Sequence, residues 1–114
     1  MKRIELIIPD RKLQDVNNVF KEANVGGMSY YRIEGRGKTK AQPITVGRGT
    51  IHYTPEFISR LKVEVVVRDV QVEELITKLV DKVGGDITTG GKIFVVDVPI
   101  AVDLATRKKG EAVI

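Results

Sequence analysis

The chain has 114 residues, of which 42% are hydrophobic and 30% charged, and its formal net charge is +4. That length suits one domain, and the composition is typical of a soluble globular protein. No apolar run reaches the roughly 18 residues of a membrane-spanning helix, and the alternating residues that follow Met1 do not resemble a secretory signal. We therefore expect one domain, residues 1–114, in the cytoplasm.

The sequence lacks the residue types that several chemistries need. It has no cysteine and one histidine, His52, which excludes disulfides, thiolate catalysis and a histidine cluster within the chain. No carboxylate or nucleophile flanks His52, so an ordinary solvated side chain is favoured over a catalytic one. The three tyrosines and three phenylalanines do not interleave with basic residues, which argues against nucleic-acid binding. We expect neither an enzyme nor a dedicated metal site.

The first third of the chain predicts a strand, a helix and a second strand. Apolar residues alternate over Ile4–Ile8 up to Pro9, and proline ends a β-ladder because it lacks an N–H. A helix is predicted next, ending before Gly26-Gly27. The run Ser29–Ile33 is rich in strand formers. The helix prediction rests on an apolar stripe with helical spacing: Leu13, Val16, Val19, Phe20 and Ala23.

The second half of the chain repeats this pattern. Alternation over Ile58–Val67 predicts a third strand. Asp69 is a suitable N-cap for a helix with an apolar stripe from Val72 to Val83, which the glycines that follow would end. The run Lys92–Val98 predicts a fourth strand.

The order β-α-β-β-α-β predicts an α+β fold, the ferredoxin-like sandwich, in which an antiparallel sheet carries both helices on one face. The other face needs a cover, because Ile7, Val66 and Val96 fall on it and are apolar. We expect another copy of the chain to supply that cover in a closed oligomer.

A long basic loop connects the second and third strands. The segment Gly35–Pro55 has no acidic residue, and its four cations equal the net charge of the chain: Arg36, Lys38, Lys40 and Arg48. The part from Lys38 to Pro55 shows no strong secondary-structure pattern and is longer than passive connections usually are. A functional loop that holds phosphates or docks on an acidic partner is favoured over an inert hairpin tip.

Two glycine-lysine segments are candidate anion sites. Gly35-Arg36-Gly37-Lys38 could bring backbone N–H groups and an ammonium near a phosphate, and Thr88-Thr89-Gly90-Gly91-Lys92 has the same ingredients before a strand. An ordinary β-turn remains an even alternative for the second segment, which lacks Walker A spacing. Asp97 is expected to pair with a lysine on the sheet, and Arg107–Lys109 to be a solvated run.

These segments, in this order and spacing, resemble the PII family of nitrogen signalling proteins along the whole chain. The fold of that family has the element order predicted above and assembles as a homotrimer. The most specific matches are Gly27-Met28-Ser29, Gly35-x-Gly37-Lys38, Lys62-Val63-Glu64-Val65-Val66-Val67 and Gly91-Lys92-Ile93-Phe94-Val95-x-Asp97-Val98.

The resemblance implies an adenine-nucleotide site in each cleft between subunits, with ATP, ADP or AMP as effector and Mg²⁺ accompanying ATP. Residues implied to line the nucleotide are Ile7, Ser29, Gly35, Gly37, Lys38, Glu64 and Val66, with Gly90, Gly91 and Lys92 at its phosphates. Thr39 and Arg60 would lie at the loop base. The T-loop, about 38–55, would dock on a target through Lys40, Arg48 and Tyr53. The C-terminal segment is 99–114.

At four places the sequence departs from the family pattern. Thr39 replaces a glutamine whose amide helps to ligate the magnesium between ATP and 2-oxoglutarate, so 2-oxoglutarate binding is not expected to carry over. Asp103 and Ala105 replace an arginine pair that holds phosphates, which points to ADP or AMP. The two further departures are the loop signature Gly47-Arg48-Gly49-Thr50-Ile51-His52, with Tyr53 one residue late, and the turn Thr89-Gly90-Gly91-Lys92.

The leading hypothesis is a PII-like signal transducer that couples nucleotide occupancy to the T-loop and regulates nitrogen metabolism or an ammonium transporter. We expect the chain to associate with a membrane only through such a transporter. The alternative is a PII-like sensor of AMP, ADP or bicarbonate that regulates a carbon-metabolic enzyme without a 2-oxoglutarate response. Two further hypotheses are an ATPase, for which no nucleophile or general base is evident, and a structural oligomer with a solvated loop.

Overall fold

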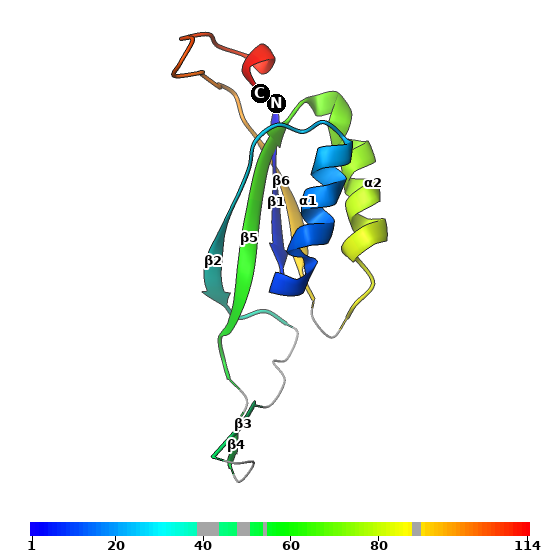
Figure 1. Cartoon of the computed structure of the whole chain (residues 1–114), viewed down its shortest axis with the longest axis vertical. Helices are drawn as coiled ribbons and strands as arrows, with labels where there is room; N and C mark the ends of the chain where they lie inside the picture. Colours follow the sequence, from blue (N-terminus) through cyan, green and yellow to red (C-terminus); the bar gives the residue numbers. More distant parts are fainter. Residues whose placement is uncertain (39–43, 48–50, 54, 88–89) are drawn as a thin grey trace.

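The computed structural model of the chain is an α+β fold in two layers, a sheet and a pair of helices (Figure 1). It describes residues 1–38, 44–47, 51–53, 55–87 and 90–114, with the backbone alone for 44–46 and 51–53.

Four strands form the main sheet: β1 (Lys2–Ile8), β2 (Met28–Gly35), β5 (Ile58–Val67) and β6 (Lys92–Asp97). They lie in the order β2-β5-β1-β6, and all three neighbouring pairs are antiparallel. The predicted third strand coincides with β5. The predicted fourth strand, β6, ends one residue early, at Asp97, and Val98 N–H donates to the Met1 carbonyl.

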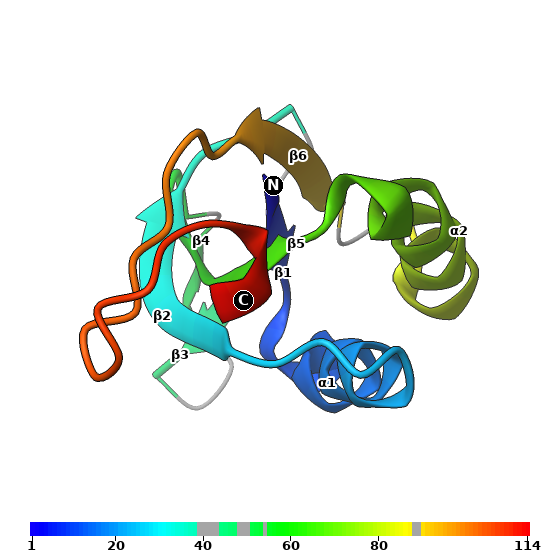
Figure 2. The ribbon, with the colours of Figure 1, turned by 90° about the horizontal axis from the view of Figure 1, so that it is seen from above.

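Two helices, each preceded by a short 3₁₀ turn, cover one face of this sheet (Figures 1 and 2). The first turn and helix are η1 (Asp10–Lys12) and α1 (Leu13–Glu22), and the second are η2 (Asp69–Gln71) and α2 (Val72–Val83). This arrangement confirms the predicted ferredoxin-like fold.

The core lies between the sheet and the helices, where the alternation of the strands meets the stripes of the helices. Its buried residues come from β1, α1, β5 and α2: Ile4, Leu6, Ile8, Val16, Val19, Phe20, Leu61, Val63, Val65, Val67, Leu75 and Leu79. Among the described residues, no polar or charged side chain is buried, so apolar burial supplies most of the stabilisation.

The end of α1 and the start of α2 differ from the predictions. Asn24 ends α1 with a left-handed φ of 55°, while Val25 N–H donates to the Phe20 carbonyl at 2.9 Å, so the glycines at 26 and 27 are not the terminator. Asp69 is not an N-cap but lies inside η2, where its carboxylate receives the Met1 ammonium at 3.0 Å. The Gln71 side chain accepts the Arg68 backbone N–H instead, at 3.2 Å.

The loop between β2 and β5 contains two short strands, β3 (Ile44–Val46) and β4 (Ile51–Tyr53), paired antiparallel. The prediction of a loop without secondary structure was therefore wrong at these positions. Ile44-Thr45-Val46 consists of β-branched residues, and Ile51-His52-Tyr53 combines one β-branched residue with an aromatic one, so both runs contain residue types that favour strands.

The C-terminal segment beyond β6 forms a second hairpin-like arm. Val102 and Lys109 form a single antiparallel bridge, and the short 3₁₀ turn η3 (Glu111–Val113) follows. Arg68 Nε lies 3.8 Å from Glu111 Oε1. Both ends of the chain lie at the same end of the molecule, near the top of Figure 1.

Candidate functional site

In the described part of the chain, neither helix covers the second face of the sheet, and only the C-terminal Val113 and Ile114 reach one end of it, beside Arg3 and Val66 (Figure 2). Strand register places alternate residues of all four strands on it, with Ile7 opposite Lys62 and Lys92, and Arg3 opposite Val66 and Val96. The three apolar residues predicted for this face are therefore on it. Phe94 joins them, 47% exposed.

A network of four charged residues and one tyrosine occupies the middle of this open face. Glu5 receives Arg3 Nε at 2.8 Å and lies 3.7 Å from Lys62 Nζ, which is also 3.9 Å from Glu64. The Tyr31 hydroxyl donates to Glu64 at 3.2 Å. The Glu5 side chain is only 12% exposed, so the network is partly shielded from water even in the single chain.

The network holds Lys62 in its charged form. The Tyr31 hydroxyl contributes most to raising the pKa of Lys62, and the carboxylates of Glu5 and Glu64 add to the effect. The pairs place two cations and two anions between apolar edges, so the open face is electrically balanced at its centre.

The glycine turn before β6 has a backbone that requires glycine. Gly90 and Gly91 both have positive φ, 64° and 119°, and a Cβ on Gly91 would lie 2.8 Å from the Ile7 carbonyl oxygen. Lys92 follows directly and is exposed. Thr88 and Thr89 lie outside the described residues. The turn thus brings bare backbone and an ammonium to the end of β1.

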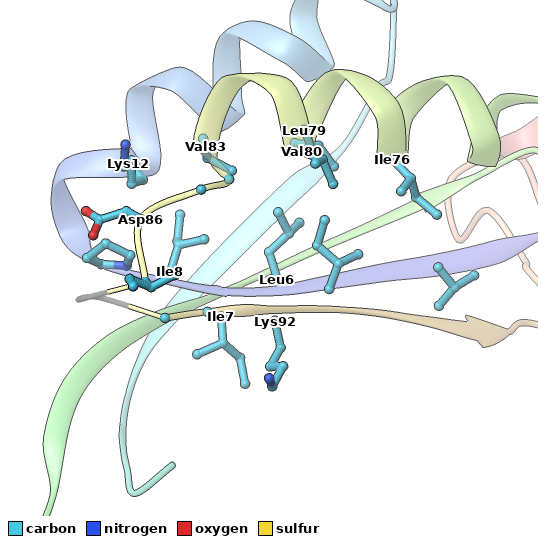
Figure 3. Close-up of a pocket in the computed structure, with 18 residues that line it drawn as sticks. Leu6, Ile7, Ile8, Lys12, Ile76, Leu79, Val80, Val83, Asp86 and Lys92 are labelled. Atoms are coloured by element: carbon cyan, nitrogen blue, oxygen red, sulfur yellow. The ribbon is translucent and has the colours of Figure 1, made fainter. Parts of the chain in front are cut away.

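A pocket of about 490 Å³ lies beside this turn, between the β1–β6 edge and α2 (Figure 3). It brings together four of the predicted nucleotide residues: Ile7, Gly90, Gly91 and Lys92. Figure 3 shows Ile7 and Lys92 pointing away from α2, whereas Leu6, Ile76 and Val83 lie on the helix side. The pocket wall towards α2 is apolar.

Three further predicted residues, Ser29, Glu64 and Val66, line a second pocket of about 550 Å³ at the other end of the sheet. Gly26 and Gly27 also line it. The two pockets share no residue. One chain therefore does not assemble the predicted nucleotide residues into a single cavity.

The base of the loop holds the remaining predicted residues. Gly35 and Gly37 do not have left-handed φ values, and a Cβ on either would meet no atom of the described residues within 4 Å, so no described contact requires glycine there. Lys38 is exposed, and Arg36 pairs with Glu56 across the loop at 2.8 Å. Arg60 lies opposite Ile33 and donates to the Ser59 carbonyl at 3.0 Å.

Several predicted loop residues cannot be placed. Thr39, Lys40 and Arg48 lie outside the described residues, and Tyr53 is placed only as the last residue of β4.

The arm positions that depart from the family pattern form a tight turn. The Asp103 carboxylate accepts the backbone N–H of Ala105 at 2.8 Å and of Thr106 at 3.4 Å, and Arg107 adopts a left-handed φ of 63°. Arg107, Lys108 and Lys109 are exposed, as predicted. Asp97, predicted to pair with a lysine, pairs with Lys2, which lowers the pKa of the carboxyl.

Sequence reasoning missed a set of contacts around η1. Arg32 donates to the Asp10 carboxylate through its two terminal nitrogens, Nη2 at 2.7 Å and Nη1 at 3.0 Å, and to Ser59 at 3.0 Å. Arg11 donates to Asp86 at 2.7 Å. These partners are far apart in the sequence, so no local pattern could have identified them.

A largely exposed sheet face, a glycine turn at its edge and a long basic loop are features of a binding domain. Among the residues described, no three His, Asp or Glu side chains converge to hold a metal ion. No helix in the described part of the chain is long and apolar enough to cross a membrane.

Residues 1–108 match the family described as "Nitrogen regulatory protein P-II". The chain is 36% identical to the P-II proteins of Microchaete diplosiphon and of Synechocystis over 109 residues, which cover 96% of each chain. It is 32% identical to P-II 1 of Escherichia coli over the full length of both. The chain belongs to the P-II family.

Membership in this family fixes the general role of the chain. P-II proteins are regulatory signal-transduction proteins and not enzymes, they bind adenine nucleotides as effectors, and they act on other proteins in nitrogen regulation. The chain is thus a member of a regulatory family, as the motifs predicted.

Proposed function

We propose that the chain forms a homotrimer that binds an adenine nucleotide between neighbouring copies and signals its occupancy through the loop at residues 38–55. The target is a protein of nitrogen metabolism, such as an ammonium transporter. A nucleotide can shift the loop only through different affinities for its docked and free forms.

The observation that carries this proposal is the separation of the predicted residues into two pockets. Ile7 and the glycine turn form one half, and Ser29, Glu64 and Val66 form the other. In a closed ring the same contact is repeated at every boundary between copies. In the proposed trimer, the first half of the nucleotide site on one copy meets the second half on its neighbour. Burial of the apolar residues of the open face would favour association of the copies.

The chemistry of each half suits part of a nucleotide. Gly91 and Lys92 offer a backbone N–H and an ammonium to phosphate oxygens, while the N–H of Gly90 is used within the turn by the Asp86 carbonyl. Gly35 and Gly37 leave room at the loop base for a ligand to approach the backbone. Magnesium that accompanies ATP would be held by the phosphates themselves together with loop-base oxygens.

Calorimetry with ATP, ADP and AMP, with and without Mg²⁺ and 2-oxoglutarate, tests the proposal. We expect at least one nucleotide to bind, and Lys92→Gln to weaken binding about tenfold by removing a charge from the phosphates. Lys78→Gln is the matched control, since Lys78 pairs with Glu74 on the outer side of α2. Absence of binding, or equal losses in both variants, would contradict the proposal.

Oligomeric state is measured separately. Light scattering coupled to gel filtration should give three times the chain mass of 12.6 kDa. Nucleotide binding by a monomer would contradict the proposal that two neighbouring copies form the site.

A second candidate is a sensor of AMP, ADP or bicarbonate that acts in carbon metabolism without responding to 2-oxoglutarate. The turn at Asp103 favours it, because the carboxylate is used by the turn and Ala105 supplies no charge to a third phosphate. Synergy between Mg-ATP and 2-oxoglutarate in the calorimetric series would exclude this candidate.

A further inference from the structure

Two consecutive residues of η1, Asp10 and Arg11, make ion pairs with two different parts of the molecule. Asp10 pairs with Arg32 of β2, and Arg11 pairs with Asp86 in the connection between α2 and β6. Figure 1 shows that the start of α1, the root of the long loop and this connection lie at the same end of the sheet.

The Asp10 contact reaches the stem of the loop. Arg32 lies three residues before the end of β2 and also donates to Ser59, the second residue of β5. The two terminal nitrogens of Arg32, Nη1 and Nη2, donate to the Asp10 carboxylate at 3.0 and 2.7 Å. A paired geometry of this kind fixes orientation as well as distance. Asp10 therefore ties η1 to both strands from which the loop emerges.

The Arg11 contact reaches the glycine turn. Its guanidinium lies 2.7 Å from the Asp86 carboxylate, whose side chain is one-third exposed. The Asp86 carbonyl accepts Gly90 N–H at 3.2 Å, which closes the turn that leads to Gly91. Movement of the turn therefore moves the partner of Arg11.

The segment between the two contacts is short and anchored. Pro9 is buried, and its carbonyl accepts Lys12 N–H at 3.0 Å. Val16 and Phe20 then fix α1 in the core with 0% and 1% exposure. A one-turn element held in this way transmits a displacement at one end to the other, because it has little freedom to absorb it.

We propose that Asp10 and Arg11 couple the glycine turn to the loop stem, so that an anion held at the turn changes the conformation of the loop. The inference rests on the proposed nucleotide site and adds the positioning residues that connect it to the loop. The turn, Asp86, Arg11, Asp10, Arg32 and Ser59 form a continuous series of contacts between the two regions.

The test separates binding from response. The sequence has no cysteine, so His52→Cys in β4 provides a single site for a fluorescent label on the loop. Nucleotide binding is measured by calorimetry and the loop response by label anisotropy, with Mg-ATP and ADP as probes. The variants Asp10→Asn and Arg11→Gln are compared with Lys78→Gln, which removes an exposed ion pair contained within α2.

We expect nucleotide affinity in Asp10→Asn and Arg11→Gln to stay within about threefold of the parent, while the anisotropy change falls about fivefold or more. Lys78→Gln should keep both. A full loop response in both coupling variants overturns the inference and leaves the proposed function standing. Absence of nucleotide binding in the parent overturns the proposed function and the coupling with it.

Hydrogen exchange gives a readout that needs no nucleotide. In Arg11→Gln, amides of the stem at 33–35 and 58–60 should exchange about threefold faster than in the parent, although the ion pair that is lost joins Arg11 to Asp86 on the turn side. The double variant Arg11→Gln/Arg32→Gln should exchange its stem amides no faster than the single variant Arg32→Gln. An effect of Arg11→Gln confined to 84–92 would contradict the coupling.

Discussion

Gly91 and Ile7 approach so closely that a Cβ on the glycine would lie 2.8 Å from the Ile7 carbonyl oxygen. Gly91→Ala also places a side chain at a φ of 119°, so we expect a loss of at least about 1–2 kcal/mol of unfolding free energy. Gly35→Ala meets no atom within 4 Å at an ordinary φ, so its stability should be equal to or above the parent's. Urea denaturation of both variants decides this.

The variant Gly35→Ala also tests the proposed nucleotide site. We expect Gly35→Ala to keep the fold and lose nucleotide affinity about tenfold, because the added methyl group occupies the space proposed for the ligand. Calorimetry on a variant shown to be folded makes the measurement. Unchanged affinity would remove Gly35 from the site.

The Arg36–Glu56 pair closes the base of the loop at 2.8 Å, although both side chains are largely exposed. Exposed pairs add little stability, so Glu56→Gln should shift the melting temperature by less than about 3 °C. Loss of the closure should nevertheless make the loop's arginine and lysine residues more accessible to trypsin. Lys78→Gln serves as the comparison, and equal cleavage rates in the two variants would show that the pair does not restrain the loop.

Acid should weaken the link between Asp10 and Arg32. The hydrogen bonds from Arg32 lower the pKa of Asp10 in the folded chain. Since the unfolded pKa is the higher one, about 3.9, the stabilisation is complete well above that pH and is lost as the pH falls through the folded value. An NMR titration should show the lowered pKa, and Arg32→Gln should return it towards the ordinary range. No change on that substitution would mean that another group causes the shift.

The core and the helix surface should respond very differently to truncation. Phe20 is 1% exposed between α1 and the sheet, so Phe20→Ala should cost about 3–5 kcal/mol of unfolding free energy. Val70 is 85% exposed, and Val70→Ala should change stability by less than about 0.5 kcal/mol. Thermal and urea denaturation give both values, and similar losses in the two would contradict the placement of the core.

A charge on the open face should disturb assembly more than folding. Val96 faces the uncovered side of β6 and is 38% exposed, so Val96→Asp leaves the helix-side core intact. We expect the trimer to dissociate, with the helical circular dichroism signal retained. Val70→Asp, on an exposed helix turn, is the control. A stable Val96→Asp trimer would show that this position lies outside the contact between copies.

The elements of the fold could be predicted because their signals are local. Alternation in β5 and the apolar stripes of α1 and α2 determine which faces are buried, and burial decides the layers. Asp69 was misassigned because its carboxylate binds the Met1 ammonium, a partner 68 positions away in the sequence. Asn24, not the glycine pair after it, ends α1, because asparagine also adopts the left-handed conformation.

The site could be predicted only in part, for a different physical reason. Glycine turns and lysines are visible in the sequence, so Gly90, Gly91 and Lys92 could be predicted as one candidate segment, and all three line one pocket. The contacts of Asp10, Arg11 and Arg32 depend on strand register and on where a helix begins, and both are set by the whole fold. Such contacts become visible only when distant segments are placed in space.

The apolar edge at β6 is exposed in a folded chain that has not yet assembled. Phe94, Val95 and Val96 are each between 38% and 47% exposed on a strand with one free side. An exposed strand of this kind is a template on which unrelated chains can add. A chain that folds before it meets a second copy therefore exposes this edge, and we expect recovery after dilution from denaturant to depend on how quickly copies find each other.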